Sequence, residues 1–433
     1  MRFPGQRKSK HYFPVNRKSL NVESEHSVKF DKNTYIVGID QIIVDICASV
    51  PRELLEKYYL SLGSSVILDD QTTQKLYAEL IDSGYIESEF AGGTIGNTLH
   101  NYSILSDEKS VLFGVMNRNI QVGNYAYKYL CATSSKVDLS YLQPVDGEIG
   151  SCFTLITEEG ERTFAISKGK MNDLDSSCIK EDLIKNSAAL VLTAYLLRED
   201  NTPILDATYQ AIQYAKKYNV PIILTLGTAK VVLENLSFWQ EFVQEHVTMV
   251  AMNEDEAIAL SGQKDVLSAC QEVLKWCDLI LCTAGRKGLY MAGWTDDSQK
   301  RITDHPLLQG KIADFNQYEY SRPMKKSDCH HPIPVYSYIE PFLGGPENIK
   351  NTNGAGDGAL SAILHDISAN IYHRLNVPNS KKHKLNYLTY SSFSQLCKYA
   401  NRVSYEVLIN SNPRLTRGLP EKEISLEEAY WDR

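Results

Sequence analysis

The sequence predicts an α/β protein with a doubly wound, mostly parallel sheet that is flanked by helices, together with a small β lid. Apolar runs rich in β-branched residues alternate with stretches of helical periodicity over roughly 200 residues. Two runs, ALVLT near residue 190 and PIILTL near residue 222, are apolar on both faces, as expected for central parallel strands. Between them, Pro203 opens a stretch in which Ile204, Ala207 and Ala211 recur at three- and four-residue spacing, which predicts an amphipathic helix.

The individual strands follow from short apolar runs that are bounded by polar or turn residues. In chain order, the predicted strands span residues 35–39, 66–68, 111–115, 188–193, 221–226, 248–252, 279–283 and 289–292. Their alternation with helical segments places most of them in one parallel sheet.

Two regions interrupt this alternation. Residues 141–166 hold two extended segments, SCFTLIT and ERTFAIS, separated by a Glu-Glu-Gly turn, which predicts a β-hairpin. We expect this hairpin to form a lid together with residues 44–62. Residues 295–348 are rich in charge, His, Pro and Tyr, and they form a long excursion without an assigned role.

Composition bounds the class of protein. The chain has 433 residues, of which 43% are hydrophobic and 23% charged, so disordered and collagen-like chains are excluded. The net charge of −8 provides no general attraction for nucleic acid or an anionic membrane. No apolar run approaches the ~18 residues of a membrane-spanning helix. Residues 1–34 are expected to be a basic, solvated arm and residues 35–433 a single α/β domain.

The cysteine content indicates the compartment. The nine cysteines are an odd number and contain no CxxC pair, and several lie in apolar runs where a thiol behaves as a small hydrophobic group. The N-terminal segment is basic but has no apolar core, so it does not predict a secretory signal. We therefore expect a reducing, cytoplasmic location.

The segment at residues 351–358, NTNGAGDG, carries the most chemical information. Gly354, Ala355 and Gly356 allow close approach of the backbone to a ligand, and the apolar periodicity that follows predicts that a helix begins there. A helix N-terminus offers free amides and partial positive charge to a phosphate. Asp357 would repel a phosphate, and it makes sense as a base that takes a proton from an attacking hydroxyl. A helix cap with glycines for tight packing is the alternative.

Four further motifs resemble ligand-binding turns. Gly92, Gly93 and Asn97 occur in AGGTIGN, where the amide suits sugar hydroxyls. Asn253 and Glu256 follow a predicted strand, where oxygen ligands suit Mg²⁺, although the motif in isolation favours a helix cap. Two more motifs lie at other strand ends: TAGRKG at residues 283–288 and GIDQIIVD, with its two aspartates, at residues 38–45.

The order of these motifs resembles the ribokinase (phosphofructokinase-B) family of small-molecule kinases from about residue 35 to residue 410. The resemblance implies an α/β kinase that uses ATP and Mg²⁺. It implies that Asp357 deprotonates the substrate hydroxyl, and that the backbone amides of Gly354, Ala355 and Gly356 form an anion hole for the transferred phosphoryl group.

The same resemblance assigns an ATP side to the site. Asn253 and Glu256 would position Mg²⁺ and the ATP phosphates through water, with Glu256 as the metal-binding carboxylate. Thr283, Gly285 and Gly288 would line the pocket for ATP.

A substrate side is also implied. Asp45 would hold ribose hydroxyls together with Gly92, Gly93 and Asn97. Arg162, in the predicted lid hairpin, is a candidate for contacting phosphate, and a solvated arginine is the alternative.

Within the family, residues 44–60 and 91–98 resemble nucleoside kinases, and the two terminal segments resemble kinases that act on inosine and guanosine. The implied reaction is ATP-dependent phosphorylation of the 5′-hydroxyl of inosine and guanosine to IMP and GMP in purine salvage. Adenosine or a sugar as substrate, or a non-catalytic nucleotide-binding member, are the alternatives. The implied partners are small molecules, with neither nucleic acid nor a membrane, and a homodimer is left open. The family usually has Asp where Asn351 stands, which leaves dependence on a monovalent cation open.

Overall fold

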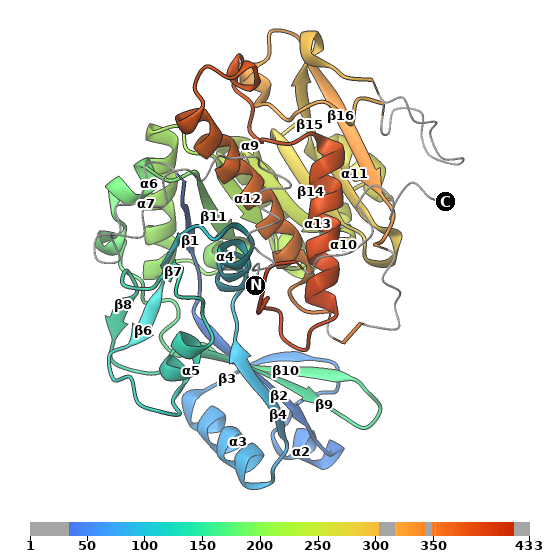
Figure 1. Ribbon diagram of the computed structural model, residues 1–433. Coiled ribbons are helices and arrows are strands. Elements are labelled where there is room, and N and C mark those ends of the chain that lie inside the picture. Colours follow the sequence, from blue (N-terminus) through green and yellow to red (C-terminus); the bar gives the residue numbers. More distant parts are fainter. Residues whose placement is uncertain (1–33, 303–316, 343–348, 351, 420–433) are drawn as a thin grey trace, which may run out of the picture.

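A nine-stranded sheet forms the centre of the protein (Figure 1). The structure is a computed structural model, and it describes residues 34–302, 317–342, 349–350 and 352–419. Neighbouring strands run parallel from β14 to β7, whereas β15 and β16 are antiparallel additions at one edge. The strands are, in spatial order, β16 (Pro332–Ile339), β15 (Leu289–Asp296), β14 (Leu279–Thr283), β13 (Met249–Asn253), β12 (Ile222–Thr225), β11 (Ala189–Thr193), β1 (Ile36–Ile39), β5 (Ser110–Phe113) and β7 (Val137–Asp138).

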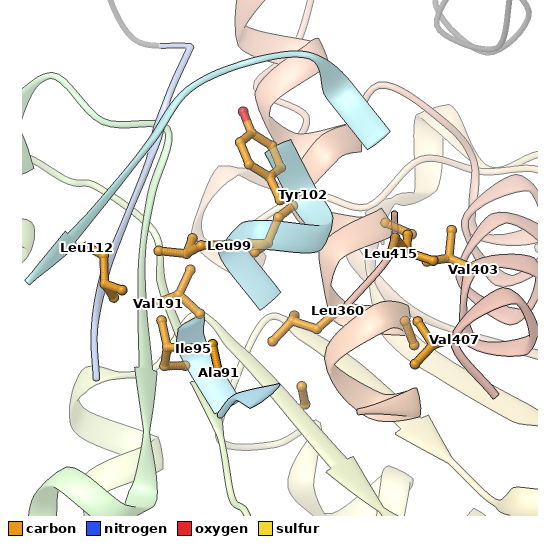
Figure 2. Close-up of a cluster of buried hydrophobic side chains, with 14 of the residues drawn as sticks. Ala91, Ile95, Leu99, Tyr102, Leu112, Val191, Leu360, Val403, Val407 and Leu415 are labelled. Carbon is orange, nitrogen blue, oxygen red and sulfur yellow. The ribbon is translucent and has the colours of Figure 1, made fainter. Parts of the chain in front are cut away.

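Helices cover both faces of this sheet, as the doubly apolar strands require. In β11 every residue is buried: Ala189 and Val191 belong to one core and Leu190 and Leu192 to the other. The first core includes α4, α12 and α13, and Figure 2 shows part of it, where Leu360 of α12 lies near Leu99 of α4 and Val407 of α13. The prediction of a doubly wound α/β sheet is therefore confirmed.

The helices have the following bounds. On the face of the first core lie α4 (Thr94–Ser106), α12 (Ala355–Asn376) and α13 (Phe393–Leu408). The second core is covered by α6 (Glu181–Lys185), α7 (Pro203–Lys217), α8 (Ala229–Glu234), α9 (Leu236–His246), α10 (Glu254–Ser261) and α11 (Val266–Val273). The remaining helices, which lie near the smaller sheet, are α2 (Arg52–Lys57), α3 (Asp70–Asp82) and α5 (Tyr125–Cys131) (Figure 1).

A separate five-stranded sheet, called the small sheet below, projects from the carboxyl end of β1 (Figure 1). The hairpin predicted in residues 141–166 forms two of its strands, β9 and β10. A further strand pair, β6 (Val115–Asn117) and β8 (Gln143–Val145), lies outside both sheets. In spatial order, the small sheet contains β3 (Ser65–Leu68), β10 (Arg162–Ser167), β9 (Gly150–Ile156), β2 (Ile43–Ser49) and β4 (Ile86–Ala91).

Two strand predictions differ from the structure, and the predicted excursion contains a strand that the sequence did not indicate. The predicted strand 66–68 forms, but it belongs to the small sheet because it pairs with β10. The predicted strand 111–115 is split at Gly114 into β5 and β6. The excursion 295–348 contains a strand that was not predicted, β16, whose Pro332 and Pro334 obscure the signal but are tolerated at a sheet edge.

Some expectations concern residues outside the described ranges. Of the predicted basic arm, residues 1–34, only Thr34 lies within the described ranges. Asn351 lies outside the described ranges. Within the described part of the chain, none of the helices has both the length and the apolar character needed to cross a bilayer.

Candidate active site

A cleft of about 1680 Å³ lies between the carboxyl ends of the main-sheet strands and the small sheet. Loops after β1, β11, β12, β13 and β14 all contribute to its lining, as does the beginning of α12. Parallel α/β sheets bind ligands at this end. Most of the predicted site residues line this one cleft: Asp45, Gly93, Asn97, Asn253, Glu256, Thr283, Gly285, Gly288, Gly354, Ala355, Gly356 and Asp357.

Asp357 lies in the first turn of α12 and faces the cleft. Its carboxylate Oδ2 accepts a hydrogen bond from Asn97 Nδ2 at 3.3 Å. The pKa of Asp357 is raised to about 7, mainly by burial; Asn97 and Arg414 oppose this rise, and the nearby Asp45 and Glu256 add to it. A carboxylate with a pKa near neutrality can exchange a proton with a hydroxyl at physiological pH.

The start of α12 has the backbone shape that the sequence predicts. Gly354 precedes the helix with a φ of 77°, a conformation that favours glycine. The first amides of a helix have no partner within the helix, so those of Ala355 and Gly356 are available to an anion in the cleft. A Cβ atom on Gly356 would meet nothing within 4 Å, which shows that this turn is open to a ligand.

We expect Gly354→Ala to lower kcat by about tenfold, because a Cβ atom there would lie 2.4 Å from Cβ of Pro413 and would displace the anion hole. Steady-state kinetics measures this effect. The matched control is Gly84→Ala, where φ is 67° but a Cβ atom meets nothing within 4 Å. That variant should lose about 1 kcal/mol of stability and keep its activity. Equal activity of the two variants would contradict the assignment of Gly354 to the anion hole.

Arg414 organises the substrate side of the cleft, and sequence analysis missed it. Its Nε donates to Asn97 Oδ1 at 2.9 Å, and its other nitrogens donate to Thr133 Oγ1 at 2.7 Å and to the Gly92 carbonyl at 3.3 Å. The side chain is buried, and its guanidinium lies 5.0 Å from the ring centre of Tyr129. Because Asn97 uses Oδ1 for Arg414, its Nδ2 is directed to Asp357. A lone arginine after α13 gives no local signal for this role.

Two aspartates follow β1 along the chain, and they have different partners. Asp45 lies in β2 of the small sheet, packed so closely against Gly92 that a Cβ atom there would lie 2.4 Å from Asp45 Oδ2. Burial raises the pKa of Asp45 to about 7, and Arg414 opposes this rise. Asp40 accepts a hydrogen bond from the amide of Gly96 at 2.7 Å and so caps α4. Gly92, a predicted site residue, does not itself line the cleft, but its missing side chain leaves room for the Asp45 carboxylate.

Asn253 and Glu256 form a capping box at the start of α10. The side-chain Nδ2 of Asn253 donates to Glu256 Oε1 at 2.8 Å, and the backbone N–H of Asn253 donates to Glu256 Oε2 at 3.0 Å. Both residues also line the cleft, so the capping interpretation and the ligand-binding interpretation apply together. Burial raises the pKa of Glu256 to about 7, and a cation in the cleft would stabilise its charged form.

Residues after β14 complete the far end of the cleft. Thr283 ends β14, and Gly285 and Gly288 flank a single 3₁₀ turn, Gly285–Lys287. A larger residue does not fit at position 288, because a Cβ atom there would lie 2.1 Å from the carbonyl oxygen of Ile339 in β16.

Arg162 is the one predicted phosphate contact that the structure keeps out of the cleft. It begins β10 and is exposed. Other cations line the cleft instead: Lys168, Arg198, Lys230 and Arg286.

Comparison with known proteins shows the family of the chain. The model of the pfkB family carbohydrate kinases matches residues 68–306. The chain belongs to this family. It is 60% identical over 434 residues to the guanosine-inosine kinase of Escherichia coli (strain K12), with all of both chains covered. Among solved structures, the adenosine kinase from Sinorhizobium meliloti is 19% identical, with a TM-score of 0.63 and coverage of 89% of this chain and 97% of that chain. A probable sugar kinase from Rhizobium etli has a TM-score of 0.64 at 17% identity, covering 90% and 97%.

Proposed function

We propose that this pfkB-family kinase transfers the γ-phosphoryl group of ATP to the 5′-hydroxyl of guanosine and inosine, which gives GMP and IMP. The full-length 60% identity to a protein named guanosine-inosine kinase supports this substrate class. The observation that carries the chemistry is the position of Asp357, which shares the first turn of α12 with the anion hole and is hydrogen-bonded to Asn97.

Phosphoryl transfer requires mainly positioning and charge stabilisation. Asp45, Gly93 and Asn97 would hold the ribose so that its 5′-hydroxyl points to Asp357. Asp357 would accept the proton as that oxygen attacks the phosphorus, and the amides at the start of α12 would stabilise the charge on the transferred group.

ATP and Mg²⁺ would occupy the half of the cleft nearer β13 and β14. Thr283, Gly285 and Gly288 would contact the nucleotide. The described residues contain no cluster of three metal-ligating side chains, which fits a magnesium ion that is held by waters, by phosphates and by one carboxylate, Glu256. When bound, the ion would neutralise charge on the phosphates. Dependence on a monovalent cation is left open.

Several expectations accompany this proposal. We place the enzyme in the cytoplasm, where ATP is available, and the nine free cysteines suit that compartment. Its partners would be small molecules, and a homodimer is left open. The small sheet would act as the lid that excludes water from the reaction. Phosphate binding by Arg162 is not part of the proposal, because the side chain lies away from the cleft.

The experiment that tests the proposal compares guanosine, inosine, adenosine and ribose in one assay with ATP and Mg²⁺. Guanosine and inosine should be phosphorylated with the highest kcat/KM. A preference for adenosine or ribose would show that the assigned substrate is wrong but that the protein is a kinase. Binding of nucleoside and ATP by calorimetry without formation of ADP would show a non-catalytic member of the family.

The pH dependence gives a further prediction. Asp357 must be ionised to accept a proton, and its pKa is raised to about 7. Activity should therefore decrease as the pH falls through about 7, with kcat/KM dropping tenfold for each pH unit below it. A pH profile of kcat/KM at saturating ATP measures this limb. A profile without an acidic limb down to about pH 5 would reject Asp357 as the base.

A further inference from the structure

The substrate half of the cleft contains a chain of polar side chains that the proposed reaction does not use. Gln41 Nε2 donates to Asn172 Oδ1 at 2.6 Å, and Asn172 Nδ2 donates to Glu199 Oε2 at 3.4 Å. Lys168 Nζ completes the chain at 2.5 Å from Glu199 Oε1. Three of the four residues, Gln41, Lys168 and Glu199, line the cleft.

The polar chain adjoins an apolar wall on the small sheet. A row of paired residues crosses four strands from Asp45 of β2 through Cys152 of β9 and Ile166 of β10 to Ile67 of β3. All four line the cleft, and Ile67 is 54% exposed although it is apolar. A planar base could cover this wall while its ribose is held by Asp45.

The dimensions agree with such a ligand. Neighbouring strands are about 4.8 Å apart, so Ile166, two strands from Asp45, lies on the order of 10 Å from it. That separation is comparable with the length of a purine nucleoside. Lys168 follows Ile166 by two residues and also lines the cleft, and Glu199 follows the 3₁₀ turn Ala194–Leu197 after β11. The ion pair thus lines the cleft next to this wall, and we place the outer edge of the base against it.

The chemistry of the pair distinguishes between purines. The Watson–Crick edge of guanine and hypoxanthine offers a donor at N1 and an acceptor at O6, whereas adenine offers an acceptor at N1 and a donor at N6. We propose that Lys168 and Glu199 determine specificity for 6-oxopurine nucleosides. This inference rests on the proposed function. Glu199 accepts from N1–H, and in guanosine also from the 2-amino group, while Lys168 donates to O6.

The same pair disfavours adenosine. Its N6 amino group would face the Lys168 ammonium, and its N1 lone pair would face the Glu199 carboxylate, so both contacts would be repulsive. The side chains of Lys168 and Glu199 are 35% and 38% exposed, so a ligand can reach both. Asn172 holds Glu199 in place through its link to Gln41.

The test measures kcat/KM for guanosine, inosine and adenosine in two variants. Glu199→Gln should lower the value about 30-fold for guanosine and about tenfold for inosine, because only guanosine has the 2-amino group, and it should leave adenosine unchanged or improved. Lys168→Met should lower guanosine and inosine equally, by about tenfold.

The matched control is Lys170→Met. Lys170 lies in the same segment and pairs with Asp173 at 3.3 Å, but it does not line the cleft. In Lys170→Met, the ratio of kcat/KM for guanosine to kcat/KM for adenosine should equal that of the wild type. An unchanged ratio in Glu199→Gln and Lys168→Met, or an equal loss for all three nucleosides, would overturn the specificity assignment. Failure of the wild type to phosphorylate guanosine and inosine would overturn the proposed function instead.

Discussion

Asp357→Asn should lower kcat for nucleoside phosphorylation by at least ~100-fold, the lower end of general-base effects. The amide has nearly the same shape as the carboxylate, so the contact with Asn97 can persist while the proton acceptor is lost. Nucleoside affinity should change little, and calorimetry would measure it separately from turnover. Asp255→Asn is the matched control, because Asp255 lines the same cleft in the first turn of α10 and has no role in proton transfer. Turnover near that of the wild type in Asp357→Asn would reject the base.

The same variant should be more stable than the wild type at pH 8. The folded-state pKa of Asp357 is raised to about 7, so the folded protein binds a proton more tightly than the unfolded chain does. The stability that this group contributes is then fully present below the unfolded-state pKa of about 4 and is lost as the pH rises through about 7. An uncharged side chain avoids this loss. The Tm of Asp357→Asn should exceed that of the wild type at pH 8, and the two values should converge near pH 4. A lower Tm at pH 8 would show that the carboxyl group of Asp357 does not have a raised pKa in the folded protein.

Arg414→Lys should lower kcat/KM by about 100-fold and move the acidic limb of the pH profile upward. A lysine keeps the charge, but its single nitrogen cannot bridge Asn97, Thr133 and the Gly92 carbonyl as the guanidinium does. Asn97 then loses the contact that directs its amide toward Asp357. Because Asn97 and Arg414 both lower the pKa of Asp357, weakening them raises that pKa further.

The control for this second variant is Arg322→Lys. Arg322 is also bound to backbone carbonyls and stacked on Tyr387, but it does not line the cleft. Both variants should lose stability, by roughly 1–3 kcal/mol. Only Arg414→Lys should displace the pH profile. If the two variants have the same acidic limb, Arg414 is a structural residue and not a positioning residue for catalysis.

The sequence predicts the parts of this molecule that depend on local signals. The central strands were found because burial on both faces leaves them apolar throughout, as in β11. The position of Gly354–Asp357 in the cleft could be predicted, because glycines that lead into a helix, followed at once by an acid, are typical of a turn that binds an anion beside a proton acceptor. Most of the other predicted site residues also line the cleft, because strand ends in a parallel sheet converge.

The residues that were missed depend on contacts between distant parts of the chain. Arg414 and Asn97 are 317 positions apart, and neither neighbourhood indicates the other. Lys168 follows β10 of the small sheet and Glu199 lies in the segment after β11 of the large sheet, so their pairing depends on how the two sheets are placed. Membership of β3 in the small sheet is likewise a matter of pairing, since its apolar run would suit either sheet.

The contact of Pro413 and Arg414 with the reaction centre has a consequence for biosynthesis. Ribosomes make α4, the small sheet and most of the residues that line the cleft before residue 414. Until that residue has left the exit tunnel, Asn97 has no guanidinium to orient it and Gly354 has no proline beside it. We therefore expect that a partly translated polypeptide does not phosphorylate nucleosides, and that activity begins only when the late segment has docked beside Gly354 and Asn97.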